Sequence, residues 1–208
     1  MRRLLIALCL IYAGTVGAAV TLDDLWNAVK ANDRSTVRQL LAKGMEPNST
    51  DQSGQSLLMY SAREGQLDMM ELLIQSGAKV NARNAHGETA LMLAAYKGNL
   101  ESIKLLHSRG AMINQNGWAS LHYAAIEGRT EVLRYLTEQG AKVDATTPNG
   151  ATALMLAARG GHLSAVQLLL EKGANPNLQT DSGATALKWA EEAGNRDIAK
   201  LLQGDRKK

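Results

Sequence analysis

The sequence predicts an all-α solenoid, a stack of short helical repeats, and two observations lead to this fold class. The first is that 15 of the 19 glycines return at three fixed positions every 33 residues, with one step of 30. A fixed period in this range is the signature of a stacked repeat array. The second is an aliphatic composition: 45% of residues are hydrophobic, only 4% are aromatic, and Phe is absent. The three series are Gly44, Gly77, Gly110, Gly140, Gly173; Gly54, Gly87, Gly117, Gly150, Gly183; and Gly65, Gly98, Gly128, Gly161, Gly194.

The first helix of each repeat is expected between the second and third glycine series. These segments carry Leu and Ala on one helical face, as in residues 88–95. Four of the five begin with Ser or Thr, whose hydroxyl can accept from the free backbone N–H groups at a helix start. The glycine that follows is expected to end the helix in the left-handed conformation. In the remaining segment Ala119 stands at the cap position, so the cap is expected to be lost or moved to Ser120.

A second helix is expected after each third-series glycine, because apolar residues recur there at i, i+3 and i+4. Leu100, Ile103 and Leu106 show this spacing. The glycines of the first series end these helices, and a polar segment of ten residues then leads to the next repeat. The expected second helices are residues 67–76, 100–108, 130–138, 163–171 and 196–202.

Two local motifs and their spacing resemble the ankyrin repeat. They are the turn Gly161-His162-Leu163 and the loop Gly140-Ala141-Lys142-Val143-Asp144-Ala145. The resemblance covers roughly residues 22–204 and implies an ankyrin-repeat solenoid of about six helix-turn-helix repeats with hairpin-like finger loops. Terminal repeats are irregular because each has only one neighbour; in the first, Asn32 stands at the inter-helix glycine position. The implied repeats are residues 22–50, 51–83, 84–113, 114–146, 147–179 and 180–204, followed by a short basic tail, 205–208.

Residues 1–19 have the pattern of a secretory signal peptide. Arg2 and Arg3 precede an apolar stretch, residues 4–12, and Gly17-Ala18-Ala19 is a small-residue cleavage site. We therefore expect an exported bacterial protein, periplasmic or secreted, with no membrane attachment in its mature form. The alternative is an uncleaved leader that tethers a scaffold to the membrane, because no charge interrupts residues 4–20.

Cleavage would change the charge and the cysteine content of the chain. Loss of Arg2 and Arg3 lowers the basic count from 23 to 21, against 20 acidic residues. The mature chain is then nearly neutral and has no clustered basic surface of the kind that nucleic acid requires. Its only cysteine, Cys9, lies in the leader, so we expect neither disulfides nor thiol chemistry.

The sequence offers no catalytic, cofactor or metal motif. The four histidines are His86, His107, His122 and His162, and none has Cys, Asp or Glu neighbours at metal-ligand spacing. Nucleotide-binding and hydrolase motifs are also missing. In the ankyrin family the positions of His122 and His162 are structural. We expect a protein without enzyme activity, cofactor or metal.

The resemblance implies a groove lined by the finger loops and the first helices, and we expect a monomer that binds a partner protein there. Tyr96, Trp118 and Ile126 place large apolar side chains near its middle, and aromatic residues flanked by Arg and Lys have the composition of an interaction hot spot. The same groove would also suit an inhibitor or immunity-type partner of a secreted enzyme. The predicted contact residues are Arg83, His86, Tyr96, Lys97, Trp118, Ile126, Glu127 and Arg159.

One finger loop is shorter than the others. Gly117 follows Gly110 by seven positions, whereas in every other finger the second glycine follows the first by ten positions. Surface loops tolerate such deletions. Alternatively, the deletion leaves a notch in the row of fingers that exposes Trp118 to a partner.

Overall fold

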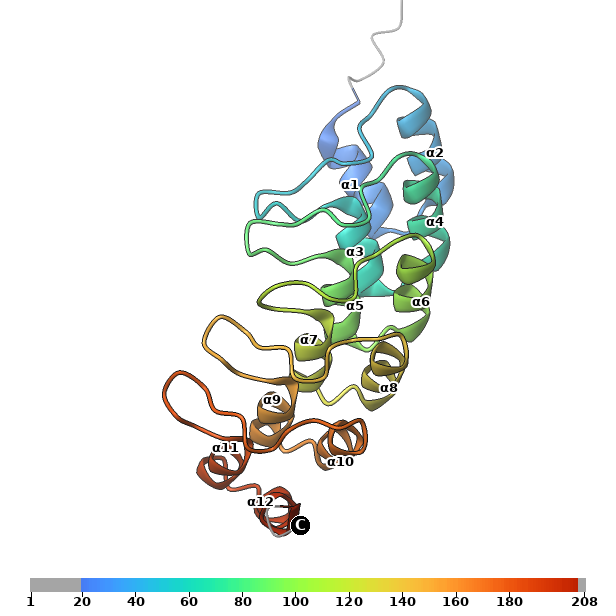
Figure 1. The fold of residues 1–208 in the computed structure, drawn as a ribbon. Coiled ribbons are helices and arrows are strands. Elements are labelled where there is room, and N and C mark those ends of the chain that lie inside the picture. Colours follow the sequence, from blue (N-terminus) through green and yellow to red (C-terminus); the bar gives the residue numbers. More distant parts are fainter. Residues whose placement is uncertain (1–19, 206–208) are drawn as a thin grey trace, which may run out of the picture.

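The computed structural model describes residues 20–205 and folds them into twelve α-helices in six consecutive pairs. Figure 1 shows two parallel columns of helices, with the finger loops projecting from the side of the first column. We call the surface formed by that first column and the fingers the groove face. The inner helices are α1 (Leu22–Lys30), α3 (Leu57–Glu64), α5 (Ala90–Lys97), α7 (Ser120–Ile126), α9 (Ala153–Gly160) and α11 (Ala186–Glu192). The outer helices are α2 (Arg34–Ala42), α4 (Leu67–Gln75), α6 (Leu100–Ser108), α8 (Thr130–Glu138), α10 (Leu163–Glu171) and α12 (Arg196–Asp205).

The predicted helices and turns are confirmed, with differences at the ends of two outer helices: α4 ends at Gln75, one residue early, and α12 extends beyond its predicted end. All 15 registered glycines have a positive φ, between 63° and 96°, and Asn32 takes the same role with a φ of 55°. The last helix runs to Asp205, so it includes the first residue of the predicted tail. Gly204 lies inside that helix and lacks the positive φ of the glycines that end the others. The predicted leader lies outside the described residues.

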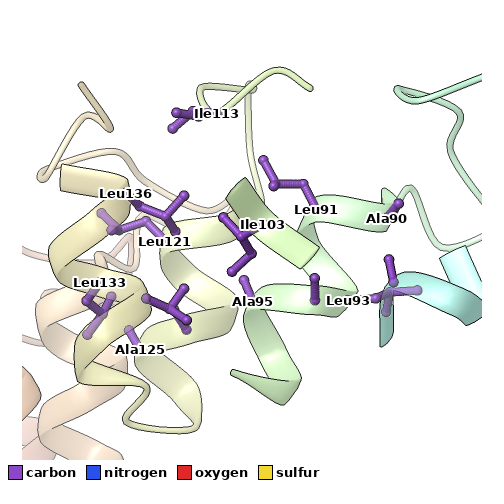
Figure 2. Close-up of a cluster of buried hydrophobic side chains, with 14 of the residues drawn as sticks. Ala90, Leu91, Leu93, Ala95, Ile103, Ile113, Leu121, Ala125, Leu133 and Leu136 are labelled. Carbon is purple, nitrogen blue, oxygen red and sulfur yellow. The ribbon is translucent and has the colours of Figure 1, made fainter. Parts of the chain in front are cut away.

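The core is one continuous aliphatic layer between the two columns, from Leu25 in the first repeat to Leu202 in the last. Figure 2 shows its central part, where Leu91 and Ala95 of α5 lie near Ile103 of α6, and Leu121 of α7 lies near Leu133 and Leu136 of α8. Each repeat is too small to bury its apolar faces alone, so stacking on a neighbour completes the core. Within residues 20–205, no helix is long and apolar enough to cross a membrane.

A side-chain hydrogen bond joins each repeat to the one before it. The residue after each left-handed inter-helix glycine is polar, and it donates to a carbonyl in the last turn of the preceding inner helix. Such carbonyls have no partner within their own helix. The donors are Gln66 to Val29 (3.1 Å), Asn99 to Ala62 (3.2 Å), Arg129 to Tyr96 (3.1 Å), His162 to Ile126 (2.8 Å) and Asn195 to Ala158 (2.8 Å).

A second set of hydrogen bonds joins successive fingers through one asparagine each. The amide of Asn81 donates to the carbonyl of Gly110 (2.8 Å), and its oxygen accepts from the N–H of Met112 (2.9 Å). Asn48 and Asn114 make the equivalent pairs of bonds. Asp144 occupies the fourth such position and accepts only from the N–H of Asn175 (2.9 Å), because an ionised carboxylate has no hydrogen to donate.

We expect Asp144→Asn to stabilise the protein, because the new amide can donate to the carbonyl of Gly173 as Asn81 does to Gly110. The gain should be about 0.5–1 kcal/mol in the free energy of unfolding, the net value of one hydrogen bond. Urea denaturation followed by circular dichroism measures it. Asn81→Asp is the matched reverse change and should destabilise. An unfolding midpoint for Asp144→Asn at or below that of the wild type would contradict this account.

Candidate partner-binding surface

Two large aromatic side chains stand exposed at the centre of the groove face. Tyr96, near the end of α5, and Trp118, just before α7, are each 38% exposed. Their rings do not contact each other in the described part of the chain; Tyr123 of α7 links them instead. The Trp118 ring meets the Tyr123 ring edge-on, with centroids 5.7 Å apart. Tyr123 and Tyr96 in turn line the same hollow, of about 330 Å³, together with Leu93 and Lys97.

The hydroxyl of Tyr123 is held by a chain of hydrogen bonds that starts in a finger. It donates to Oε1 of Glu88 (3.1 Å), and Oε2 of Glu88 accepts from the amide of Asn84 (2.7 Å). Partial burial, followed by the neighbouring Glu88 carboxylate, raises the pKa of Tyr123 well above its usual value of 10. Tyr123 is therefore a neutral donor with a fixed orientation, and it supports the exposed Trp118 ring from one side.

Glu127 orients Tyr96 in a similar way. A hydrogen bond from the Tyr96 hydroxyl to the Glu127 carboxylate raises the pKa of Tyr96 above 10, and the negative charge of Glu127 adds to the effect. Nη2 of Arg129 lies 3.6 Å from Glu127, while Nε of the same guanidinium donates to the carbonyl of Tyr96 (3.1 Å). Arg129, which joins two repeats, thus also helps to position Glu127 and Tyr96.

Four other predicted contact residues do not line the central hollow. Ile126 is half-buried and packs against the core, and its contact with a partner stays a prediction. Arg159 lies over the ring of Trp189, 4.7 Å from its centroid, and is not among the residues that line the central hollow. His86 is exposed in a finger, where its N–H donates to Oδ1 of Asn84 (3.0 Å). Arg83 lies beside the short finger.

Sequence reasoning missed Tyr60, Tyr123 and Trp189, which occupy the same repeat position on α3, α7 and α11. All three are half-buried and pack against the core, and Tyr60 is also covered by Arg63, whose guanidinium lies 5.3 Å from the ring centroid. Aligning the repeats on their glycines would have found them. The position carries Tyr60, Leu93, Tyr123, Leu156 and Trp189, so it is always large and apolar.

His122 meets the Trp118 ring edge-on, with centroids 5.8 Å apart, and it bonds the residue just before α7. Its Nδ1 accepts from the N–H of Ala119 (3.0 Å), and its Nε2 donates to the carbonyl of Ala145 (2.9 Å). The cap hydroxyl that the other inner helices have at this position is lost here; it has not moved to Ser120, whose Oγ is buried and makes no hydrogen bond within residues 20–205. Burial lowers the pKa of His122 below 6.5, so the ring is neutral and holds this tautomer.

The short finger, residues 110–117, differs from the others in how its turn is built. In the finger that ends at Gly87, Asn84 closes the turn: its carbonyl accepts from Gly87 (3.0 Å) and its N–H donates to Glu88 (3.0 Å). The fingers ending at Gly54, Gly150 and Gly183 make the same two bonds. Within the described residues the short finger makes neither.

The missing three residues explain why this turn stays open. A ten-residue finger uses two different residues for these bonds. The residue that joins the next finger, such as Asn81, is four positions after the first glycine. The residue that closes the turn, such as Asn84, is three positions before the second glycine. In the short finger both positions fall on Asn114, whose amide bonds Gly140 and Lys142 of the next finger. A hollow of about 520 Å³ lies beside this finger, lined in part by Arg83, Met112 and Lys142.

Another hollow, of about 650 Å³, lies at the N-terminal end of the groove face. Trp26 and Tyr60 line it with their rings edge-on and 6.1 Å apart, and Lys30 lies over Trp26. None of the predicted contact residues lines this hollow. We therefore place the candidate site at the centre, where the aromatic side chains are exposed. In residues 20–205 no group of three or more His, Cys, Asp or Glu side chains is arranged to hold a metal ion.

Comparison with known proteins identifies one family. A model described as ankyrin repeats (3 copies) matches residues 25–117, 77–147 and 121–207. These matches overlap and together span nearly all of the chain that the structure describes. No curated protein matches the chain.

We expect His122 to make stability depend on pH. Because its pKa is lowered in the folded state, the unfolded chain binds the proton more readily, and the free energy of unfolding should fall as pH drops below about 6.5. His122→Met should reduce that dependence. Met stands at the equivalent position in three other repeats, and Met59 accepts there from the N–H of Ser56 (3.4 Å). Urea denaturation at about pH 7.5 and pH 5 measures the difference; equal losses for wild type and variant would contradict it.

Proposed function

Because the chain belongs to the ankyrin-repeat family, whose repeats generally mediate protein–protein interaction, we propose that it is a non-enzymatic module that binds a partner protein through the centre of its groove face. The observation that carries this proposal is the pair of exposed aromatic side chains, Tyr96 and Trp118, around Tyr123. Exposed aromatic residues near the centre of a surface are the usual anchors of protein interfaces.

A hydrogen bond to Tyr96 and two ring contacts to Trp118 support a binding role. Glu127 holds the Tyr96 hydroxyl, and Tyr123 and His122 support the Trp118 ring on two sides. Side chains that are already fixed lose little conformational freedom when a partner docks, so more of the contact energy appears as affinity. Each aromatic anchor could contribute about 2 kcal/mol in a desolvated interface.

The surroundings of the anchors favour a partner with an apolar centre and polar edges. The central hollow is lined by the apolar side chain of Leu93 and by the charged side chains of Arg63, Glu64 and Lys97. Lys97 makes no ion pair within residues 20–205, so its charge is available to a partner. A charged rim around an apolar core is the general anatomy of a protein interface.

We expect the double variant Tyr96→Ala/Trp118→Ala to lose partner binding, by about 100-fold or more if each ring contributes as a hot spot. The tagged protein is used to capture partners from its native cellular fraction, and mass spectrometry identifies and quantifies what each variant retains. Leu163→Ala is the matched control, because Leu163 is also 38% exposed but begins the outer helix α10. If both variants capture the same proteins in equal amounts, the groove face is not the binding surface.

We also propose that the protein is exported, periplasmic or secreted, and acts as a monomer after removal of residues 1–19. The start of the first described helix supports this boundary. Thr21 caps α1: its hydroxyl accepts from the N–H of Asp24 (3.3 Å), while its own N–H donates to the Asp24 carboxylate (2.8 Å). A chain cut after Ala19 would keep this capping box complete.

If the leader is cleaved, the protein recovered from the exported fraction should have an intact mass that lacks residues 1–19. Mass spectrometry of the undigested protein measures it, and size-exclusion chromatography with light scattering tests the monomer. A mass that retains residues 1–19, together with membrane association, would instead support the tethered scaffold.

A further inference from the structure

The hollow beside the short finger carries two positive charges and no negative one. Arg83 comes from the preceding finger and Lys142 from the following one, and no Asp or Glu lines the space between them. Neither cation makes an ion pair within residues 20–205. The Arg83 guanidinium is held in place by the carbonyl of Gly87 (3.2 Å) and by the side-chain oxygen of Gln115. Unneutralised cations on two walls of a hollow make its potential positive.

The open turn of the short finger adds unpaired backbone donors to this hollow. In the preceding finger, the N–H groups of residues 85, 86, 87 and 88 are all hydrogen-bonded, to Ser53 or Asn84. The equivalent groups in the short finger belong to residues 115, 116, 117 and 118, and none makes a hydrogen bond within the described part of the chain. Residues 115–117 line the hollow. Successive backbone N–H groups in a turn are an anion-binding arrangement.

Neighbouring fingers do not close the gap. The N–H of Ala85 donates to the carbonyl of Ser53 (3.3 Å), and that of Asp181 donates to the carbonyl of Asn149 (3.1 Å), so these fingers are joined near their tips. The equivalent donor next to the short finger would be residue 148, which is Pro148 and has no N–H. The tips of the short finger and of the following finger therefore lack this hydrogen bond, and the hollow lies between these two fingers.

We propose that this hollow binds an acidic side chain, Asp or Glu, of the partner protein. The inference rests on the proposed function and names the chemistry of one part of the same surface. A carboxylate would accept hydrogen bonds from Arg83, Lys142 and the open turn, all of which are donors. Met112, 52% exposed, and Ala145 supply an apolar wall for the methylene groups of the acidic residue. Because Trp118 directly follows the turn, the partner segment carries this acidic residue close to the apolar group that contacts Trp118.

Hexaglutamate is a suitable probe, and NMR titration of the ¹⁵N-labelled protein is the measurement. We expect saturable shifts of the amide signals of residues 115–118 that weaken as salt is added. Arg83→Ala/Lys142→Ala should weaken binding about tenfold or more, since it removes two charge-assisted contacts. Arg38→Ala/Lys200→Ala removes the same charge from the outer helices α2 and α12 and should leave binding unchanged. Equal weakening by both pairs would overturn the proposal, because it would show an effect of net charge alone.

A second variant tests the shape of the turn. Insertion of Ala-Ala-Asn after Asn114 restores the ten-residue spacing and supplies a separate residue to close the turn. It should abolish the shifts while both cations remain. Unchanged hexaglutamate binding by this variant, or tighter binding of inorganic phosphate than of hexaglutamate by the wild type, would overturn the assignment to an acidic side chain.

Capture experiments separate this inference from the proposed function. We expect Arg83→Ala/Lys142→Ala to capture about tenfold less partner than the wild type, whereas Arg38→Ala/Lys200→Ala captures as much. If Tyr96→Ala/Trp118→Ala abolishes capture and Arg83→Ala/Lys142→Ala does not reduce it, the proposed function stands and the acidic contact is wrong. If neither double variant changes capture, the groove face itself is excluded.

Discussion

The stack depends on one repeated hydrogen bond, made by the polar residue that follows each left-handed inter-helix glycine. Asn99 shows its geometry: the amide reaches back to two carbonyls at the end of the preceding inner helix, those of Ala62 (3.2 Å) and Arg63 (2.6 Å). The bond satisfies groups that every helix end leaves without a partner. It also sets the spacing between neighbouring inner helices, so equivalent residues of successive repeats form columns on the groove face. The core and the candidate site both follow from that register.

The number of residues in each finger explains why the short finger is chemically different from the rest. A ten-residue finger has one residue to join the next finger and another to close its own turn. Removing three residues leaves Asn114 to serve both purposes, and it makes the joining bonds. The stack therefore continues without a break, while the turn loses its internal hydrogen bonds. The deletion therefore keeps the hydrogen bonds that join the fingers. It leaves the backbone N–H groups of the turn without hydrogen-bond partners in residues 20–205, beside the hollow that Arg83 and Lys142 line.

Much of the candidate site could be predicted, but not how its parts are grouped. Tyr96 and Trp118 are exposed as expected, because repeat spacing places them on the groove face. Tyr123, which links them, was overlooked since it falls at a position that also packs against the core. Ile126 is the last residue of the same helix and also packs partly against the core, and Arg159 lies over the Trp189 ring. Spacing assigns a residue to a face of a helix; it does not say which neighbour the side chain selects.

The sequence alone determined the fold class, most of the helix boundaries, the left-handed turns and the place of the short finger. Glycine period and apolar spacing are local properties of the chain, and each repeat obeys them independently of its neighbours. Only the tertiary structure decided that His122 bonds the carbonyl of Ala145, that Glu88 and Glu127 orient two tyrosines, and that Arg83 and Lys142 face one hollow. These are contacts between residues about 23 to 60 positions apart, and they form only when neighbouring repeats stack in register.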